Sequence, residues 1–294
     1  MTQPAPHSSP SPTQPLATTN HDRDNAGMTY VYPVVSRRAG GVSIGINLNI
    51  NNACNWRCIY CQVPNLKRGG PVAINLPQLE DELQRMLTDI VFGDFMQRCV
   101  PADMRQLNDI ALSGNGEPTS APEFPAVVEL IGRVLANFKL THPIKLVLIT
   151  NGSLTNKAYV QQGLRRLAQL NGEVWFKFDR ATAAGMKEIN DTETDPERHY
   201  QRMKTTTELC PTWLQSCFFS FDGAHPKATE IDAWLSMLQR AKTENIALRG
   251  IFIYGLARPS LQAEAVHLGK LAEDWLQALA NQITSIGWPV RVIL

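Results

Sequence analysis

The feature that most constrains the fold is a repeated alternation of strand-like and helix-like segments from residue 40 onward. Short apolar or β-branched runs are each followed by a longer segment with apolar residues at helical spacing. The strand-like runs are "GVSIGINLNI", "NDIALSGNGEP", "IKLVLITNG", "EVWFKFD", "LQSCFFSFDG", "IALRGIFIYG" and "WPVRVIL". This alternation predicts βαβ units and a parallel sheet. It leaves an open doubly wound sheet, a complete barrel and a partial barrel as alternatives.

The helical periodicity is clearest after Pro77, a residue suited to a first helical turn. There the apolar positions are Leu79, Leu83, Met86, Leu87, Ile90 and Val91. Further helices are expected over roughly 123–139, within the polar region 181–210, around 231–238 and before the last strand. Thr155 is expected to cap the helix that follows "IKLVLITNG".

Composition bounds the class of protein. The chain has 294 residues, 44% of them hydrophobic, which is enough for one large domain. Its 28 basic and 27 acidic residues nearly cancel, which argues against a broad nucleic-acid-binding surface. No apolar run is long enough to span a bilayer, and the N-terminus lacks the layout of a secretory signal. We therefore expect a soluble, cytoplasmic protein without a membrane partner.

The first 27 residues differ from the rest. They are rich in Pro, Ser, Thr and Gln and poor in large apolar side chains. Such a segment buries too little surface to offset its ordering entropy, so a disordered tail is expected over 1–27 and one folded domain over 28–294. Translation from Met28 instead of Met1 is a further hypothesis.

Three cysteines lie close together in "CNWRCIYC", at Cys54, Cys58 and Cys61. A structural zinc site uses four ligands, usually in two pairs, and no second C-x2-C pair exists here. A cubane iron–sulfur cluster normally takes four thiolates, so three leave one iron with an open coordination position. An open position binds a substrate or cofactor, and the spacing therefore favours chemistry over a purely structural site.

"CNWRCIYC" resembles the signature of the radical S-adenosylmethionine (SAM) enzymes, including the aromatic Tyr60 before the last cysteine. The resemblance implies that the thiolates hold a [4Fe–4S] cluster, whose fourth iron binds the amino and carboxylate groups of SAM. It implies an oxidoreductase-type enzyme in which an electron from a flavodoxin- or ferredoxin-type reductant cleaves SAM, and the 5′-deoxyadenosyl radical abstracts a substrate hydrogen. It also implies a partial (β/α)6 barrel with its site at the carboxyl ends of the strands.

Further motifs extend the resemblance. "SGNGEPT" is similar to a Gly-Gly-Glu-Pro-like motif that contacts the SAM amino group, with Asn115 in place of the first glycine and Gly116, Glu117 and Pro118 matching. The residues "INLNINNACNWRCIYCQ", "SGNGEPT" and "LITNGSL" are together most similar to the branch with wyosine-type tRNA-modifying enzymes. Asn151, in "TNGS", is a candidate SAM contact, although this sequence is also ordinary turn chemistry.

Other charged residues are candidates by position. Alternation directs Lys177 and Asp179 to one face of the fourth strand, where they contact the cofactor or form an internal salt bridge. Asp222 and Arg249 lie near later strands, and Arg258 lies in a loop, "YGLARPS", that either closes over the barrel or links elements at the surface.

The remaining cysteines and basic pairs favour simpler interpretations. Cys99, Cys210 and Cys217 are scattered, which is typical of buried free thiols and not of a second cluster. The pairs Arg37–Arg38 and Lys67–Arg68 are phosphate-contact candidates but are more typical of solvated charges. The leading hypothesis is a radical SAM enzyme acting on an unidentified substrate. The alternatives are modification of a tRNA base and a non-catalytic iron–sulfur sensor or electron carrier.

Overall fold

The computed structural model describes residues 15–17, 26–36, 38–138, 140 and 142–293. Its main feature is a curled sheet of eight strands in the order β1-β2-β5-β6-β7-β8-β10-β12. The first pair, β1 and β2, is antiparallel, and every other neighbouring pair is parallel. The strands are β1 (Val31–Ser36), β2 (Gly41–Ile46), β5 (Leu107–Leu112), β6 (Lys145–Thr150), β7 (Gly172–Lys177), β8 (Thr212–Cys217), β10 (Leu248–Tyr254) and β12 (Val290–Ile293).

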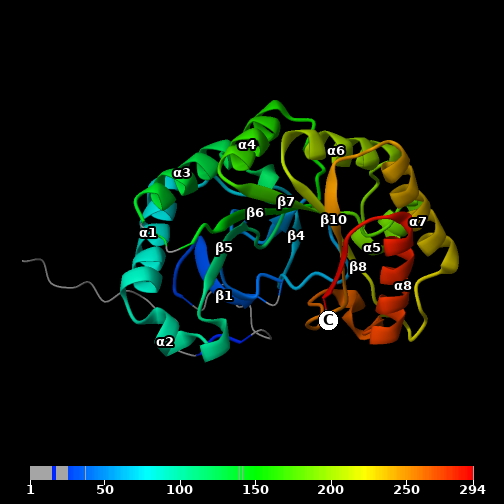
Figure 1. Cartoon of the computed structure of the whole chain (residues 1–294), viewed down its shortest axis with the longest axis horizontal. Coiled ribbons are helices and arrows are strands. Elements are labelled where there is room, and N and C mark those ends of the chain that lie inside the picture. The colour runs from blue at the N-terminus through cyan, green and yellow to red at the C-terminus, as the bar shows by residue number, and fades with distance from the viewer. Residues whose placement is uncertain (1–14, 18–25, 37, 139, 141, 294) are drawn as a thin grey trace, which may run out of the picture.

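The helices form an arc around the outside of this curl, and the sheet is not closed between β1 and β12 (Figure 1). They lie in the connections between parallel strands, and most of them bury an apolar face against the sheet. They are α1 (Leu76–Phe92), α2 (Phe95–Cys99), α3 (Phe124–Ala136), α4 (Ala158–Gln169), α5 (Ala183–Asn190), α6 (Pro196–Leu209), α7 (Ala228–Thr243) and α8 (Glu273–Ile286). The predicted partial (β/α)6 barrel is therefore confirmed.

Four short strands lie outside the main sheet. β3 (Ala53–Cys54) pairs with β4 (Lys67–Arg68), and β9 (Ser220–Phe221) pairs with β11 (Leu268–Gly269). The first pair closes the ends of the segment that carries the cysteines. The two ends of that segment are therefore held together by backbone hydrogen bonds.

The inner face of the curled sheet is made by every second residue of each strand, because successive side chains point to opposite faces. Apolar members of this face are Ala111, Val147, Trp175 and Phe252, which form their own buried cluster. Polar members include Ser43 and Asp109, which are direct partners across β2 and β5. The outward residues join the helices in the main core, so the inner face is left for a cavity.

Some expectations from the sequence need correction. The antiparallel edge strand β1 was not predicted, and the region 181–210 contains two helices, α5 and α6, where one was expected. Thr155 does not cap α4, which begins three residues later. Its hydroxyl donates instead to the carbonyl of Gly152 at 3.0 Å, because the chain makes an extra turn before the helix begins.

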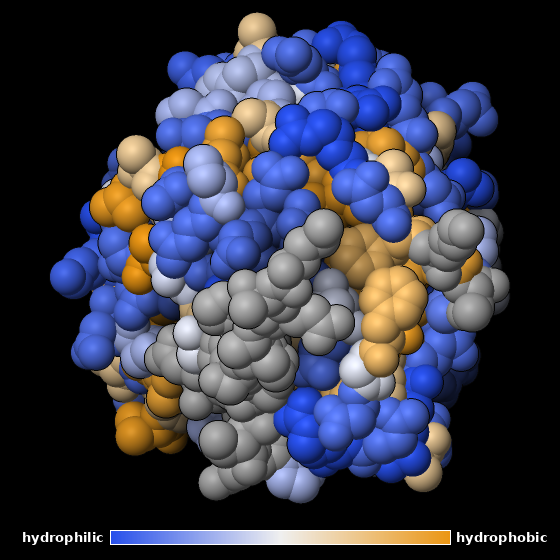
Figure 2. Space-filling view, turned by 90° about the vertical axis from the view of Figure 1, so that its left-hand side faces the viewer, coloured by the Kyte–Doolittle hydropathy of each residue, from blue (hydrophilic) through white to orange (hydrophobic). Residues whose placement is uncertain are grey.

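Most of the predicted tail, 1–27, lies outside the described residues, so its disorder stays a prediction. Of the described part, Leu16 is buried and its N–H donates to the Cys99 carbonyl at 2.7 Å. The face that carries α1 is mainly hydrophilic, with apolar residues in separate patches (Figure 2). Among the described residues, no helix combines the length and the apolar character needed to cross a membrane.

Candidate functional site

A cavity of about 1070 Å³ occupies the inside of the curled sheet. The side chains that line it come from the inner faces of the strands, from the cysteine loop (residues 53–68) and from residues 254–261. All three clustered cysteines and Glu117 are among them. The sequence-based prediction that these groups share one site therefore agrees with where the chain places them.

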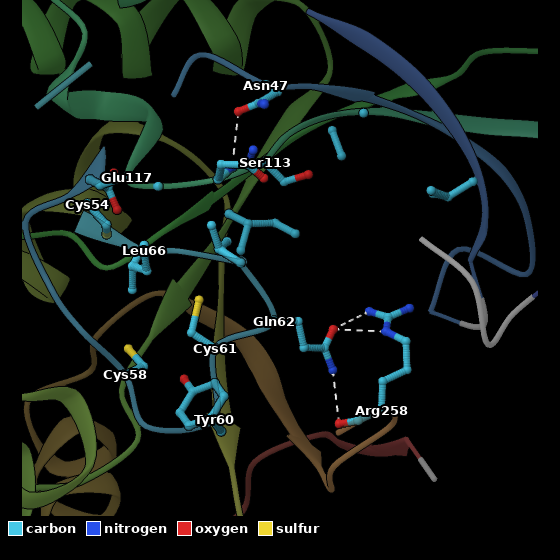
Figure 3. Close-up of a pocket in the computed structure, with 18 of the residues that line it drawn as sticks. Asn47, Cys54, Cys58, Tyr60, Cys61, Gln62, Leu66, Ser113, Glu117 and Arg258 are labelled. Atoms are coloured by element: carbon cyan, nitrogen blue, oxygen red, sulfur yellow. Dashed lines mark hydrogen bonds between the residues drawn. The ribbon is translucent and has the colours of Figure 1, made fainter. Parts of the chain in front are cut away.

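The cysteine loop follows β2 and crosses the carboxyl ends of the strands. Cys58, Cys61 and Tyr60 lie together on the left of the close-up, below Cys54 and Glu117, while Gln62 and Arg258 meet on the right (Figure 3). In the part of the chain that is described, no three side chains of His, Cys, Asp or Glu converge on one point as ligands of a single ion do. Thiolates that bind different irons of one cluster need no such convergence.

The thiols lie in a low-dielectric environment with a nearby cation. Burial raises the pKa of Cys54 to about 11 and that of Cys58 to about 12. The ammonium group of Lys177 acts in the opposite direction on both thiols. Thiols held in the neutral form are poor nucleophiles, and a metal that binds them displaces their protons. The environment is thus suited to ligands and not to a free catalytic thiolate.

Lys177 ends β7 and lines the cavity beside the cysteine loop. Its Nζ lies 5.5 Å from the centre of the Tyr60 ring. Burial lowers the pKa of this ammonium, but the neighbouring Tyr254, Cys58 and Asp179 outweigh it and leave the pKa above its ordinary value. Lys177 is therefore a fixed positive charge in the cavity wall at neutral pH.

Asp179 lies behind the cysteine loop, and its carboxylate is occupied by the protein itself. Oδ2 accepts from the Tyr60 hydroxyl at 2.5 Å and from Asn190 Nδ2 at 2.8 Å, and Oδ1 accepts from the Cys217 N–H at 2.8 Å. Asp179 and Tyr60 therefore hold the loop on β7. Their direct contact with a cofactor stays a prediction.

Asn190 forms a link that sequence reasoning missed. From the end of α5, its Nδ2 donates to Cys58 Sγ at 3.2 Å as well as to Asp179. The neighbouring backbone adds two bonds, from Arg57 N–H to the Asn190 carbonyl and from Ile59 N–H to the Ile189 carbonyl. No motif at "KEIND" indicates this role, because the contact joins residues more than 130 positions apart.

Glu117 is 2% exposed and is held by a ring of donors. Oε1 accepts from the N–H and the hydroxyl of Thr119 and from the Thr150 hydroxyl, while Oε2 accepts from the Asn151 N–H at 2.7 Å. Burial raises the pKa of this carboxyl, and these bonds partly offset the effect. Oε2 keeps accepting capacity on a carboxylate that lines the cavity, which suits an ammonium group of a ligand.

Asn151 directly follows β6 and ties it to the cysteine loop. Its Nδ2 donates to Asn55 Oδ1 at 2.9 Å, and its Oδ1 accepts from the Ser153 N–H at 3.0 Å. The next residue, Gly152, has a φ of 65°, where a Cβ would lie 2.0 Å from the Phe176 ring. Asn151 lines the cavity, but both of its amide groups already have partners, so a SAM contact there stays a prediction.

The glycine of the "GEP" motif has a packing role. A Cβ on Gly116 would lie 2.1 Å from the Ala53 carbonyl oxygen, so the two loops meet without a side chain between them. The cysteine loop therefore fills the space beside Gly116. Pro118 is buried and begins a short 3-10 helix, Pro118–Ser120, that positions Thr119 against Glu117.

Asn115, the departure from the family motif, lines the cavity as well. Its Nδ2 donates to Asn52 Oδ1 at 2.6 Å, and its N–H donates to Asn47 Oδ1 at 3.0 Å. Its own Oδ1 is buried with no hydrogen-bond partner among the described residues. A buried acceptor without a partner beside Glu117 is a polar group that a bound ligand would satisfy.

Residues 254–261 cover the site, as one of the two interpretations of "YGLARPS" predicted. Arg258 Nε and Nη2 donate to Gln62 Oε1 at 2.8 and 2.6 Å, and the Arg258 carbonyl accepts from Gln62 Nε2 (Figure 3). The Ser260 hydroxyl donates to the Ile59 carbonyl at 2.7 Å. The segment is therefore fastened to the cysteine loop and forms one wall of the cavity.

Several other candidates lie elsewhere. Asp222 is exposed and pairs with His267 at 2.6 Å, and Arg249 is exposed at the beginning of β10. Cys99 and Cys210 are buried away from the cavity, whereas Cys217 lines it.

The two basic pairs are partly used within the chain. Arg68 pairs with Asp191 at 2.7 Å, and Lys67 contributes to β4. Arg38 lines the cavity, and Arg37 lies outside the described residues.

Comparisons with solved structures address the fold. A radical SAM methyltransferase from Sphaerobacter thermophilus superposes with a TM-score of 0.58, over 90% of this chain and 68% of that one, at 10% identity. TYW1 with a lysine-pyruvate adduct bound gives a TM-score of 0.55 over 83% of this chain and 73% of that one, at 16% identity. The chain has the radical SAM fold. The fold that the cysteine motif implied is thereby confirmed.

Sequence comparisons add less. No protein-family model matches the chain. A UPF0026 protein from Helicobacter pylori is 30% identical over 139 residues, which are 45% of this chain and 38% of that protein. The chain thus spans less than half the length of the curated relatives it matches. The radical SAM fold is established by structure, and the cofactors and the reaction are separate proposals.

Proposed function

We propose that this chain is a radical SAM enzyme with one [4Fe–4S] cluster bound by Cys54, Cys58 and Cys61. The observation that carries the proposal is that these thiols and the buried carboxylate of Glu117 line one cavity at the carboxyl ends of the strands of a radical SAM fold. The three cysteines fit a [4Fe–4S] cluster, because soft thiolates are the usual ligands of iron–sulfur clusters.

The residues around the cavity have separate tasks in this proposal. Glu117 accepts a hydrogen bond from the SAM ammonium through Oε2, and Asn115 Oδ1 offers a second acceptor. Lys177 offsets the negative charge of the thiolates. When bound, the cluster supplies the electron that divides SAM into methionine and a 5′-deoxyadenosyl radical. The wall formed by residues 254–261 keeps water away from that step.

The alternatives have less support. A sensor or electron carrier has no use for a large cavity lined by a buried carboxylate. Modification of a tRNA base would need phosphate contacts near the site, but Arg68 is paired with Asp191 and Arg38 faces the interior. No specific observation therefore favours either alternative.

The reaction needs an external one-electron reductant, and we infer a flavodoxin- or ferredoxin-type protein for this role. The six free cysteines and the proposed cluster suit a reducing compartment such as the cytoplasm.

The decisive test compares two cysteine variants after anaerobic reconstitution with iron and sulfide. Cys58→Ala removes a proposed ligand, and Cys99→Ala removes another buried thiol, one that does not line the cavity. The wild type and Cys99→Ala are expected to bind about four irons per chain and to form 5′-deoxyadenosine from SAM with dithionite. Cys58→Ala is expected to lose both properties.

Two results would overturn the proposal. One is 5′-deoxyadenosine formation by Cys58→Ala at the wild-type rate. The other is a wild-type protein that takes up zinc in place of iron under the same conditions.

A further inference from the structure

Two charged side chains that line the cavity have no part in the proposed function. Asp109 comes from the inner face of β5, and Arg38 from the turn between β1 and β2. Both line the cavity. Asp109 lies four residues before Ser113, so the two residues are about 13 Å apart along the chain. We call this pair the deep site.

Asp109 offers an acceptor to the cavity. Only 5% of the residue is exposed, and the Ser43 hydroxyl donates to its Oδ1. Among the described residues, Oδ2 has no hydrogen-bond partner. Burial raises the pKa of this carboxyl to about 6, while the Ser43 bond and the charges of Arg38 and Lys145 oppose the rise. Asp109 is therefore a buried acidic group in the cavity wall that keeps Oδ2 as an acceptor for a ligand.

Arg38 offers donors to the same space. Its Nη1 donates to Gln215 Oε1 at 3.0 Å, and its guanidinium lies 5.4 Å from the Trp175 ring centre and 5.1 Å from that of Tyr254. Arg38 is half-buried and forms no ion pair with any described residue. Most of its N–H donors are left for a ligand, and a planar guanidinium binds carboxylates through two parallel bonds.

The two charges influence each other without pairing. Arg38 lowers the pKa of Asp109, yet no salt bridge within 4.0 Å joins them in the described chain. A neutral ligand would leave both charges without a partner in a poorly solvated space, which is unfavourable. A molecule with a carboxylate and an ammonium on the same carbon atom would satisfy both.

We propose that the deep site binds the substrate, and that the substrate is a free α-amino acid. Its carboxylate contacts Arg38, its ammonium contacts Asp109, and its side chain extends along the cavity toward the cysteine loop. This inference rests on the proposed function for its chemistry but not for its binding. A nucleobase lacks the paired charges and is the rival occupant.

The test is equilibrium dialysis of the full chain against an equimolar mixture of the standard protein α-amino acids, read by mass spectrometry. Parallel mixtures contain the N-acetyl derivatives, which lack the ammonium, and the amides, which lack the carboxylate. The cluster-loaded wild type is expected to retain one or a few free amino acids. Each derivative is expected to bind about 10- to 100-fold more weakly, the effect of losing one charged hydrogen bond.

Two variants separate recognition from a structural effect. Arg38→Gln is expected to lose the preference for the free acid over the amide, and Asp109→Asn to lose the preference for the free amine over the N-acetyl form. Asp109→Asn keeps an oxygen for Ser43, so it should fold. The exposed Arg249→Gln is the matched control and should bind as the wild type does.

The outcomes are distinct from those of the proposed function, because iron content and 5′-deoxyadenosine are measured on the same samples. A wild type that cleaves SAM but retains no amino acid overturns this inference alone. So does retention that neither variant changes, retention of SAM only, or preference for adenosine or guanosine added as competitors. Retention that depends on Arg38 and Asp109 supports the inference even in a protein that fails to bind iron or to form 5′-deoxyadenosine, and in that case only the proposed function is contradicted.

Discussion

At the scale of single residues, the site is built from side chains whose hydrogen bonds are nearly complete before any ligand arrives. Glu117 illustrates this: Oε1 takes bonds from Thr119 and Thr150, while Oε2 takes only one, from Asn151. The donors fix the carboxylate in one rotamer and leave one oxygen directed to the cavity. A group that is oriented in advance loses little entropy on binding.

The Glu117→Gln variant tests this orientation. Its neutral amide cannot pair with an ammonium group, so we expect the affinity for SAM to fall about 10- to 100-fold. Equilibrium dialysis of labelled SAM on the cluster-loaded protein measures it. The control is Glu82→Gln, which alters a buried carboxylate that accepts from the backbone N–H groups of residues 29–31 and from Gln78 Nε2 and does not line the cavity. Equal SAM affinity in the two variants would show that Glu117 does not contact SAM.

At the scale of elements, the cysteine loop is positioned by segments that are distant in sequence. The end of α5 binds it through Asn190, residues 260–262 bind it through Ser260, and the loop after β5 packs on it at Gly116. These contacts come from a helix end and from loops and not from strands of the main sheet. The barrel thus provides the anchoring points, and the loop takes its shape from its neighbours.

A methyl group at Gly116 should disturb this packing. In Gly116→Ala the Cβ meets the Ala53 carbonyl at 2.1 Å, so the cysteine loop must shift. We expect a loss of about 1–3 kcal/mol in the free energy of unfolding and reduced iron content after reconstitution. Gly70→Ala is the matched control, because its Cβ meets nothing within 4 Å at the end of the same loop. Urea unfolding measures the free energy of unfolding, and iron analysis measures the iron content. Equal values for the two variants would show that the contact between Gly116 and Ala53 does not position the cysteine loop.

At the scale of the whole molecule, one buried histidine joins the helical layer, the sheet and the cysteine loop. His199 of α6 packs against the rings of Trp56, Phe176 and Phe178, with centroids 4.5–5.4 Å apart. Its Nε2 bonds the Lys177 carbonyl at 2.9 Å, and Nδ1 is buried without a partner. Burial lowers its pKa from 6.5 to about 4, so the folded protein holds it neutral.

This histidine makes the fold sensitive to acid. Because folding lowers the pKa of His199, its neutral ring stabilises the folded state fully at pH values above 6.5. This stabilisation is lost as the pH falls from 6.5 to about 4. The loss reaches about 3 kcal/mol at the lower end. Asp109 acts in the opposite direction, since burial raises its pKa to about 6 and its protonation favours the fold.

Urea unfolding between pH 7.5 and 4.5 measures this effect. His199→Gln should unfold more easily at pH 7.5 but show a shallower decline with acid, whereas the exposed His225→Gln should decline as the wild type does. If stability declines with acid as steeply in His199→Gln as in the wild type, His199 is not the source of the decline.

The sequence by itself determined the repeating architecture and the identity of the proposed ligands. Strand and helix periods are local properties, so the parallel strands and most helices could be predicted from apolar spacing. The cysteine motif is also local, because its thiols lie within eight residues of one another. The antiparallel β1 escaped prediction because its pairing with β2 depends on where the chain turns back.

Only the tertiary structure decided which side chains surround the ligands. Asn190 reaches Cys58 across 132 positions, and Arg38 reaches Gln215 across 177. It also showed that Asp179 supports the loop instead of lining the cavity, a difference that alternation along one strand cannot reveal. Hydrogen bonds and burial between distant segments exist only once the sheet has curled, so no local pattern records them.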